Sequence, residues 1–331
     1  MFNNKSILVT GGTGSFGKQF IREILNKYTP SRVIVFSRDE LKQYEMAQIF
    51  TNKCMRFFIG DVRDQSRLIT AMVDVDYVIH AAALKHVPAA EYNPMECIKT
   101  NILGGQNVIE AAIQQKVTQV VALSTDKAAN PVNLYGASKL ASDKLFVAAN
   151  NISGKNGTKF SVVRYGNVAG SRGSVLQLFD SLRQKGTKSF PITDTRMTRF
   201  WLPLTQGVEI TLKAFQRMQG GEIFVPKIPS IYMTDLAKSM CEDAEIEVIG
   251  IRPGEKLHEL MITEEDSRQT FEFPDHFVIV PAISFFEPVN YSINKLNEIG
   301  KPVAEEFEYH SGNNPHFLSV EEIRQLNQLI L

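Results

Sequence analysis

Four side chains that can exchange protons lie in one short stretch in the middle of the chain. Asp126 and Lys127 follow an apolar run, residues 120–123, which we expect to be a buried strand. Tyr135 and Lys139 come next at a spacing of four, which places two side chains on one face of a helix. Because a nearby ammonium favours the phenolate, Lys139 is expected to lower the pKa of Tyr135. The stretch therefore predicts acid–base chemistry, and other elements must position it.

Asp126 and Lys127 each have a simpler interpretation as well. An aspartate after a strand is often a helix cap or a turn residue, and a lysine in a loop is often a solvated surface amine. Their position just before Tyr135 and Lys139 favours a place in the same site instead.

A strand, a glycine-rich turn and a helix are predicted at the start of the chain. Residues 6–10 form an apolar run, and residues 20–25 carry apolar side chains at helical spacing. Glycines in the turn let the backbone approach phosphates, and a helix N-terminus offers free N–H groups. This order predicts a site for the pyrophosphate of a dinucleotide, lined by Gly11, Thr13, Gly14, Ser15, Phe16 and Gly17.

The end of the second predicted strand, residues 32–36, indicates which dinucleotide binds. A site for NAD usually has an acid here, whereas an arginine accommodates the 2′-phosphate of NADP. Ser37 and Arg38 stand at this position with Lys42 nearby, so NADP is expected. Asp39 and Glu40 follow, but acids also favour the first turn of a helix. Arg38 taken alone could equally be a solvated surface charge.

Two further strand ends carry candidate ligand contacts. Asp61 and Val62 follow the third predicted strand, where an acid could bind the adenine amine or cap the next helix. The fourth strand runs into Ala81, Ala82 and Ala83, which are small enough for close packing against a cofactor. Lys85 follows on the same loop and is a candidate for substrate or cofactor contact, because ligands bind at this edge of open α/β sheets.

Strand and helix patterns alternate through residues 6–165, which predicts an α/β fold with a doubly wound parallel sheet. After about residue 167 the alternation weakens. We therefore expect a dinucleotide-binding domain with the catalytic residues at 1–166, and a smaller, interleaved substrate-binding region at 167–331. Ser319 and Glu322 form a capping-box pattern ahead of a closing helix.

Composition narrows the functional class. Lys+Arg and Asp+Glu are both 36, so the formal charge is zero, which argues against a large surface for nucleic acid or anionic membranes. Three scattered cysteines favour reduced thiols and no metal site. No secretory signal or membrane-spanning run is evident, so a cytoplasmic protein is expected.

Three motifs together resemble the extended short-chain dehydrogenase/reductase superfamily: the glycine-rich turn, the Tyr135/Lys139 pair, and residues 164–168, Arg-Tyr-Gly-Asn-Val. The triplet Thr125-Asp126-Lys127 then looks like that of the inverting UDP-N-acetylglucosamine 4,6-dehydratases. Residues 193–201, 224–230 and 250–259 extend this resemblance over nearly the whole chain. One departure is mild: the family often has Thr at the position of Ser138.

The resemblance implies a tightly held NADP that is recycled within the reaction. Tyr135, as phenolate, would remove the proton from the sugar O4, and Thr125 would bind the same region. Lys127, if neutral, would take the C5 proton, and Asp126, if protonated, would protonate the leaving 6-hydroxyl. Two coupled groups can exchange protons, so this division of roles stays open.

The resemblance further implies UDP-N-acetylglucosamine as substrate, with an inverted C5 and a place at the start of pseudaminic acid biosynthesis. It also implies a homo-oligomer built on dimers, such as a hexamer. Val168 is expected beside the cofactor. The residues expected to bind the sugar nucleotide are Lys85, Asn167, Arg172, Thr193, Arg199, Arg252 and Glu255.

Two alternatives remain from the sequence. A UDP-sugar 4-epimerase or C5-epimerase would hold the same cofactor but would need no acid for water loss. A non-catalytic NADP-binding regulator on this fold would tend to lack Tyr135 or Lys139, and both are present.

Overall fold

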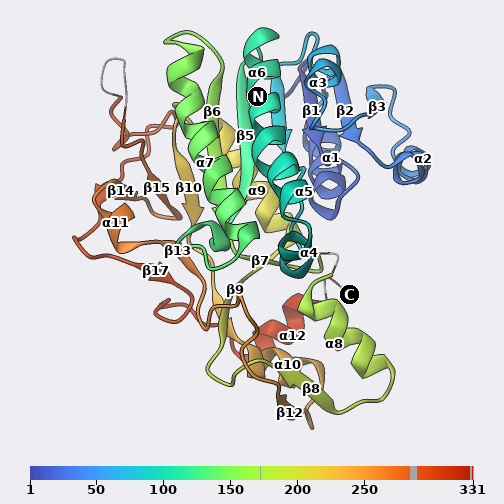
Figure 1. The fold of residues 1–331 in the computed structure, drawn as a ribbon, viewed down its shortest axis with the longest axis vertical. Helices are drawn as coiled ribbons and strands as arrows, with labels where there is room; N and C mark the ends of the chain where they lie inside the picture. The colour runs from blue at the N-terminus through green and yellow to red at the C-terminus, as the bar shows by residue number, and fades with distance from the viewer. Residues whose placement is uncertain (172, 284–288, 329, 331) are drawn as a thin grey trace.

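The computed structural model describes residues 1–171, 173–283, 289–328 and 330. Its centre is a 10-stranded sheet with the order β16-β14-β15-β10-β6-β5-β4-β1-β2-β3 (Figure 1). The strands from β10 to β3 in this order are parallel, and the other three are antiparallel to their neighbours. The expected doubly wound α/β fold is confirmed, with the strand order 3-2-1-4-5-6 of dinucleotide-binding proteins.

The first six parallel strands coincide closely with the predicted strands, and β10 was not predicted. They are β1 (Ser6–Thr10), β2 (Arg32–Ser37), β3 (Met55–Ile59), β4 (Tyr77–His80), β5 (Gln119–Thr125), β6 (Lys159–Tyr165) and β10 (Ile223–Pro226). The antiparallel strands are β14 (Thr270–Glu272), β15 (His276–Ile279) and β16 (Lys301–Pro302). Segments after residue 167 therefore complete the main sheet, while the boundary at residue 166 stays a prediction.

Helices cover both faces of the sheet and bury two separate apolar cores. On one face lie α3 (Gln65–Ala71), α6 (Gly104–Gln114) and α7 (Leu134–Ser153), and on the other α1 (Ser15–Lys27) and α9 (Leu204–Arg217). The apolar stripe of α1 buries Phe20, Ile21 and Ile24 against β1 and β2. Short helices α2 (Glu40–Ile49), α4 (Val87–Tyr92), α5 (Pro94–Ile98) and α11 (Glu264–Ser267) connect strands, and a π-helical turn, η1 (Lys99–Leu103), leads into α6.

A smaller lobe lies beyond the carboxyl edge of the parallel strands (Figure 1). It contains β8 (Ser189–Ile192), β12 (Glu245–Val248), α8 (Val175–Gln184), α10 (Met233–Met240) and α12 (Val320–Gln328). Its own core includes Phe179, Phe190, Trp201 and Leu236. A three-stranded sheet of β11 (Ser230–Tyr232), β9 (Thr198–Pro203) and β7 (Asn167–Ala169) connects the lobe to the main sheet, and β13 (Leu260–Ile262) pairs with β17 (Tyr309–His310).

The predicted closing helix is present as α12, with Ser319 and Glu322 bonded to each other's backbone N–H groups. Across the described residues, no helix is both long enough and apolar enough to cross a membrane.

Candidate active site

A cavity of about 940 Å³ opens at the carboxyl edge of the parallel strands and continues against the smaller lobe. Its volume suits a large ligand. The predicted catalytic, cofactor and substrate residues all border it, except Arg172, which lies outside the described residues. The structure therefore brings together side chains from residue 11 to residue 255.

The glycine-rich turn forms a close-packed cradle beneath one end of the cavity. Gly11 has a φ of +64°, and a Cβ there would lie 2.9 Å from the backbone of Ala82. A Cβ on Gly17 would lie 2.5 Å from the backbone of Gly12. The first turn of α1 has no acidic residue, and no side chain caps its N-terminus at Gly14. Free N–H groups at such a helix end suit the pyrophosphate of a dinucleotide.

The predicted 2′-phosphate site has two basic groups, each of which lies near a carboxylate. Arg38 Nη1 lies 3.6 Å from Asp61 Oδ2, and the Arg38 side chain is 55% exposed. Lys42 forms an ion pair with Asp39, which also caps α2. Asp39 is thus a helix cap, which was the simpler of its two predicted roles. Both cations remain within reach of an anion that enters the cavity.

Local packing fixes where Asp126 and Lys127 stand. They form the 3₁₀ turn η2 (Asp126–Ala128) directly after β5. A Cβ on Gly136 would lie 2.2 Å from the carbonyl oxygen of Lys127, so this glycine lets α7 pack tightly against the turn. Asn133 caps α7 through Gly136 N–H and also donates to the Gly254 carbonyl, which ties the helix start to the 252–254 turn.

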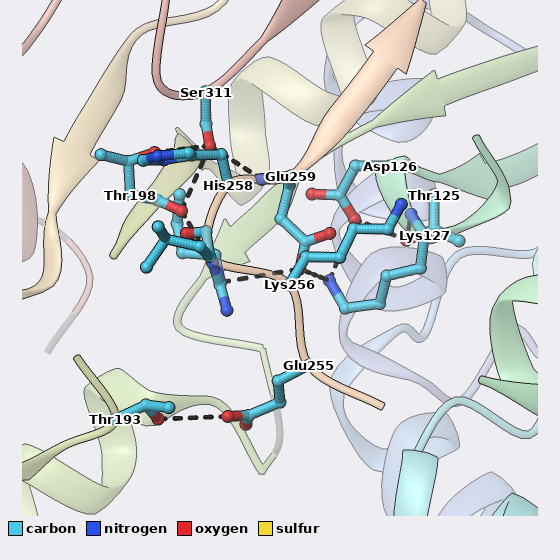
Figure 2. Close-up of polar contacts among 12 residues, drawn as sticks. Thr125, Asp126, Lys127, Thr193, Thr198, Glu255, Lys256, His258, Glu259 and Ser311 are labelled. Atoms are coloured by element: carbon cyan, nitrogen blue, oxygen red, sulfur yellow. Dashed lines mark hydrogen bonds and ion pairs between the residues drawn. The ribbon is translucent and has the colours of Figure 1, made fainter. Parts of the chain in front are cut away.

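Lys127 lies between two buried carboxylates (Figure 2). Its Nζ is 3.0 Å from Asp126 Oδ1 and 3.0 Å from Glu259 Oε1. The side chains of Asp126 and Glu259 are only 1% and 3% exposed. Thr125 donates to the same Asp126 oxygen over 3.0 Å. Asp126 Oδ2 and Glu259 Oε2 are buried and have no hydrogen-bond partner within the described part of the chain.

The three groups shift one another's pKa values. Burial raises the pKa of Asp126, although Lys127 opposes the shift. Burial alone would lower the pKa of Lys127, but the two carboxylates outweigh it and raise the pKa well above its usual range. Burial also favours neutral Glu259, yet Lys127 and Arg199 hold its pKa below the ordinary value. The protein's own groups therefore favour protonated Lys127, whereas the expected base is neutral.

The surroundings of Tyr135 also differ from the expectation. Burial raises the pKa of Tyr135 to about 12, and the cation that opposes this is Lys127 rather than Lys139. Lys139 Nζ donates to the Leu123 carbonyl over 2.7 Å. Burial lowers the pKa of Lys139, with Asp143 acting in the opposite direction. The i, i+4 spacing predicted a shared face correctly but did not show which cation would influence the phenol.

The predicted substrate residues surround the other end of the cavity. Asn167 on β7 pairs with Trp201 on β9 in a parallel register, and its Oδ1 lacks a partner in the described residues. Thr193 donates to Glu255 Oε2 over 3.1 Å. Arg199, also on β9, donates to the Thr198 carbonyl and lies 3.6 Å from Glu259 Oε1.

Arg252 and Lys85 line the same cavity from two loops, and the Arg252 side chain is 59% exposed. An exposed arginine near a buried cluster suits a phosphate contact.

Sequence reasoning missed two residues of this site. Glu259 lies in the motif at residues 250–259, but the sequence predicts no role for it. Turns and bends interrupt residues 253–258, so no regular spacing indicates where its side chain points. Trp201 is 1% exposed, borders the cavity, and its Nε1 lacks a partner among the described residues. Both residues have a buried polar atom without a hydrogen-bond partner, and this feature can be recognised only in the folded structure.

The described residues contain no group of three or more His, Cys, Asp or Glu side chains able to hold a metal ion.

The sheet order, the glycine cradle and the Tyr135/Lys139 pair define an extended short-chain dehydrogenase/reductase fold. Residues 7–281 match the model of a family described as polysaccharide biosynthesis protein, and the chain belongs to this family.

Its relatives include a Campylobacter jejuni protein named UDP-N-acetylglucosamine 4,6-dehydratase (inverting), 59% identical over 98% of both chains. A Rickettsia canadensis protein named UDP-glucose 4-epimerase is 41% identical over 98% of this chain and 96% of its own.

Solved structures agree with the fold. The structure of Pen from Bacillus thuringiensis superposes with a TM-score of 0.87 at 40% identity, covering 99% of both chains. The dTDP-glucose 4,6-dehydratase DesIV from Streptomyces venezuelae has a TM-score of 0.69 at 23% identity, covering 76% of this chain and 86% of its own, and shows the shared fold only.

Proposed function

We propose that the protein is a configuration-inverting UDP-N-acetylglucosamine 4,6-dehydratase, a hydro-lyase. The observation that carries the proposal is the pairing of Asp126 with Lys127 inside the cavity, 3.0 Å apart and next to Tyr135. Water loss needs an acid for the leaving hydroxyl and a base for the neighbouring C–H, and this pair supplies both. The 59% identity to a protein of that name supports the same conclusion.

NADP is the proposed cofactor. The glycine cradle and the uncapped start of α1 suit its pyrophosphate, and Arg38 and Lys42 suit a 2′-phosphate. When bound, it accepts a hydride from C4 of the sugar and returns it to C6. Lys139 borders the same cavity and is proposed to hold the nicotinamide ribose.

The chain's own residues would move the protons in a fixed order. Tyr135 takes the O4 proton while Lys127 is still charged, because that charge stabilises the phenolate. A proton then passes from Lys127 Nζ to Asp126 Oδ1 across their 3.0 Å hydrogen bond. Neutral Lys127 removes the C5 proton, and protonated Asp126 donates its proton to the leaving 6-hydroxyl, so the pair ends as it began. C5 then gains a proton on its opposite face, and Tyr135 gives up the O4 proton, so the protons balance.

A UDP-sugar 4-epimerase is the second candidate. The Rickettsia relative carries that kind of name at 41% identity, and the cofactor half of the cavity would serve either reaction. An epimerase has no use for an acid that releases water. The buried Asp126, with its pKa raised by burial, therefore favours the dehydratase.

Incubating the protein and NADP with UDP-N-acetylglucosamine tests the proposal. We expect an NMR signal from a C6 methyl group, and in deuterium oxide we expect deuterium at C5, with proton couplings that report an inverted centre. Formation of UDP-N-acetylgalactosamine alone would reject the dehydratase in favour of the epimerase. Tight NADP binding without any turnover would favour the regulator.

Two further expectations belong to the proposal. Entry of the product into pseudaminic acid biosynthesis follows from the same resemblance. A homo-oligomer is supported by apolar side chains on α4 and α5, where Tyr92 is 88% and Met95 55% exposed.

A further inference from the structure

Glu259 is a buried carboxylate in the cavity that the proposed reaction does not yet use. Its side chain is 3% exposed, and its Oε1 lies 3.0 Å from Lys127 Nζ, which also contacts Asp126 (Figure 2). Its Oε2 has no partner among the residues that the structure describes. Burying a carboxylate is costly unless something compensates it, and Lys127 is the nearest cation.

The backbone around Glu259 is held firmly enough to place this carboxylate. Its N–H donates to Ser311 Oγ over 2.9 Å, and its carbonyl accepts from Ser311 N–H over 2.8 Å. The preceding His258 Nδ1 lies 2.7 Å from Thr198 Oγ1, and Lys256 Nζ donates to the Ala129 carbonyl. The flanking side chains thus anchor this segment, while Glu259 reaches the cavity (Figure 2).

The charged groups that face Glu259 come from three parts of the fold. Lys127 and Asp126 come from the turn after β5, Arg199 from β9, and Lys256 from its own segment. Lys127 and Arg199 keep the pKa of Glu259 low despite burial. Glu259 in turn raises the pKa values of both Asp126 and Lys127. It is therefore the member of the group that stays ionised.

We propose that Glu259 is a positioning residue that holds Lys127 Nζ beside Asp126 and stabilises the ammonium formed when Lys127 takes the C5 proton. This inference rests on the proposed dehydratase function. In that step the C5–H bond breaks, its proton goes to Lys127 Nζ, and its electron pair moves to the 4-keto group. The electron pair then returns to form a C5=C6 double bond, and the C6–O bond breaks as Asp126 gives its proton to the departing hydroxyl, which leaves as water.

Glu259 also sets the pH range of the reaction. The Asp126/Lys127 pair must keep one proton, because the pair can act as acid and base only with that proton. The negative charge of Glu259 makes the last proton harder to lose. Without this charge, the pair should lose its last proton at a lower pH, and the alkaline limb of the pH–kcat profile should move the same way.

The test compares wild type with Glu259→Gln, Glu259→Asp and Glu265→Gln in the presence of NADP and UDP-N-acetylglucosamine. Glu265 is exposed on α11 and provides the matched loss of a carboxylate outside the cavity. For Glu259→Gln we expect kcat to fall about 10²-fold. We also expect slower deuterium exchange at C5 and an alkaline limb shifted down by roughly one pH unit. Bound NADP should be unchanged, and Glu265→Gln should behave as wild type.

Glu259→Asp keeps the negative charge but moves it away by one methylene group. Its kcat should therefore fall less than that of Glu259→Gln, and the alkaline limb of its pH–kcat profile should stay near the wild-type position. An unshifted limb in Glu259→Gln, or wild-type kcat in Glu259→Asp, would overturn the inference. The kcat of Glu259→Asp tests the inference even if Glu259→Gln fails to fold. A wild-type protein that releases no dehydrated product would reject the proposed function itself, and the inference with it.

Discussion

Two groups of paired charges in this molecule have a similar arrangement but differ in the burial and in the hydrogen bonding of their carboxylates. The cavity cluster consists of Asp126, Lys127, Arg199 and Glu259, and the sheet cluster consists of Arg217, Asp275, His276 and Glu298. Each places a cation between two carboxylates, which are 1% and 3% exposed in the cavity cluster and 43% and 34% exposed in the sheet cluster. In the sheet cluster, every carboxylate oxygen accepts a hydrogen bond.

In the cavity cluster, one oxygen of each carboxylate is unpaired among the described residues. Leaving a buried acceptor without a partner costs free energy, so a folded protein keeps it only where something else is gained. The sheet cluster joins the end of α9 to β15 and to the segment at residue 298, and thus stabilises the fold. The difference suggests that the cavity cluster is maintained for a ligand.

The largest expected effect comes from removing the central cation of the cavity cluster. Lys127→Met deletes the proposed C5 base and leaves Asp126 facing Glu259. Dehydration of UDP-N-acetylglucosamine should fall about 10³-fold or more, as loss of a positioned base generally costs 10²–10⁴. NADP should remain bound, because its proposed contacts lie elsewhere. The C6 methyl signal and the protein-bound cofactor are the two measurements.

The matched control is Lys213→Met, which removes a lysine that lies 3.3 Å from Asp275 in the sheet cluster. It should leave turnover unchanged. If Lys127→Met kept wild-type turnover, or both variants lost it equally, the functional difference between the clusters would be refuted.

Removing the central cation of the sheet cluster should act on stability instead. The Arg217 side chain is 8% exposed and lies 3.0 Å from Asp275 and 2.7 Å from Glu298. Asp275 and Glu298 are 43% and 34% exposed and can be solvated, so Arg217→Met mainly removes charge-assisted hydrogen bonds. It should lower the free energy of unfolding by about 2–3 kcal/mol. Urea unfolding measures this, with kcat assayed well below the melting temperature.

Arg183→Met is the surface counterpart, because Arg183 is half exposed and pairs with Asp180 over 2.7 Å. Its expected cost is below about 0.5 kcal/mol. Equal costs for the two variants would mean that burial does not decide the worth of these pairs.

The smallest expected effect is a pH dependence of stability. Burial lowers the pKa of His276 to about 4 from its ordinary 6.5. His276 therefore binds a proton more readily in the unfolded chain than in the folded protein. The stability that neutral His276 contributes is fully present above pH 6.5 and is lost as the pH falls from 6.5 toward 4. In His276→Asn, the fall in unfolding free energy between neutral pH and about pH 4 should shrink by about 2 kcal/mol.

Urea titrations across that pH range provide the measurement. His316→Asn alters an exposed histidine and should leave the pH dependence as it is. If the free energy of unfolding of His276→Asn depended on pH as it does in the wild type, folding would not lower the pKa of this imidazole.

Much of the fold could be predicted because its signals are local. Apolar runs predicted the bounds of β1, β2 and β6 to within a residue. The glycine-rich turn at Gly11 predicted a dinucleotide-binding site. The sequence did not predict that β10, β14 and β15 pair within the main sheet. These strands have three or four residues each, and their partners lie far away in the chain.

The site divides in the same way. Asp126 and Lys127 were found because they stand next to Tyr135 in the sequence. Glu259 is 132 positions from Lys127, and only the folded chain shows that they touch. The charge of Lys127 also escaped prediction, since it depends on two carboxylates rather than on residue type. The residue types in the site could be read from the sequence, but the contacts between segments that are far apart in the chain could not.

The position of Trp201 has a practical consequence. The chain contains a single tryptophan, and it is buried in the cavity wall with its indole N–H unpaired among the described residues. Its emission therefore originates from one known place and should respond when a ligand alters the polarity or hydrogen bonding around the indole. The protein thus carries a built-in optical probe, with which ligand affinities could be titrated without a label and apart from turnover.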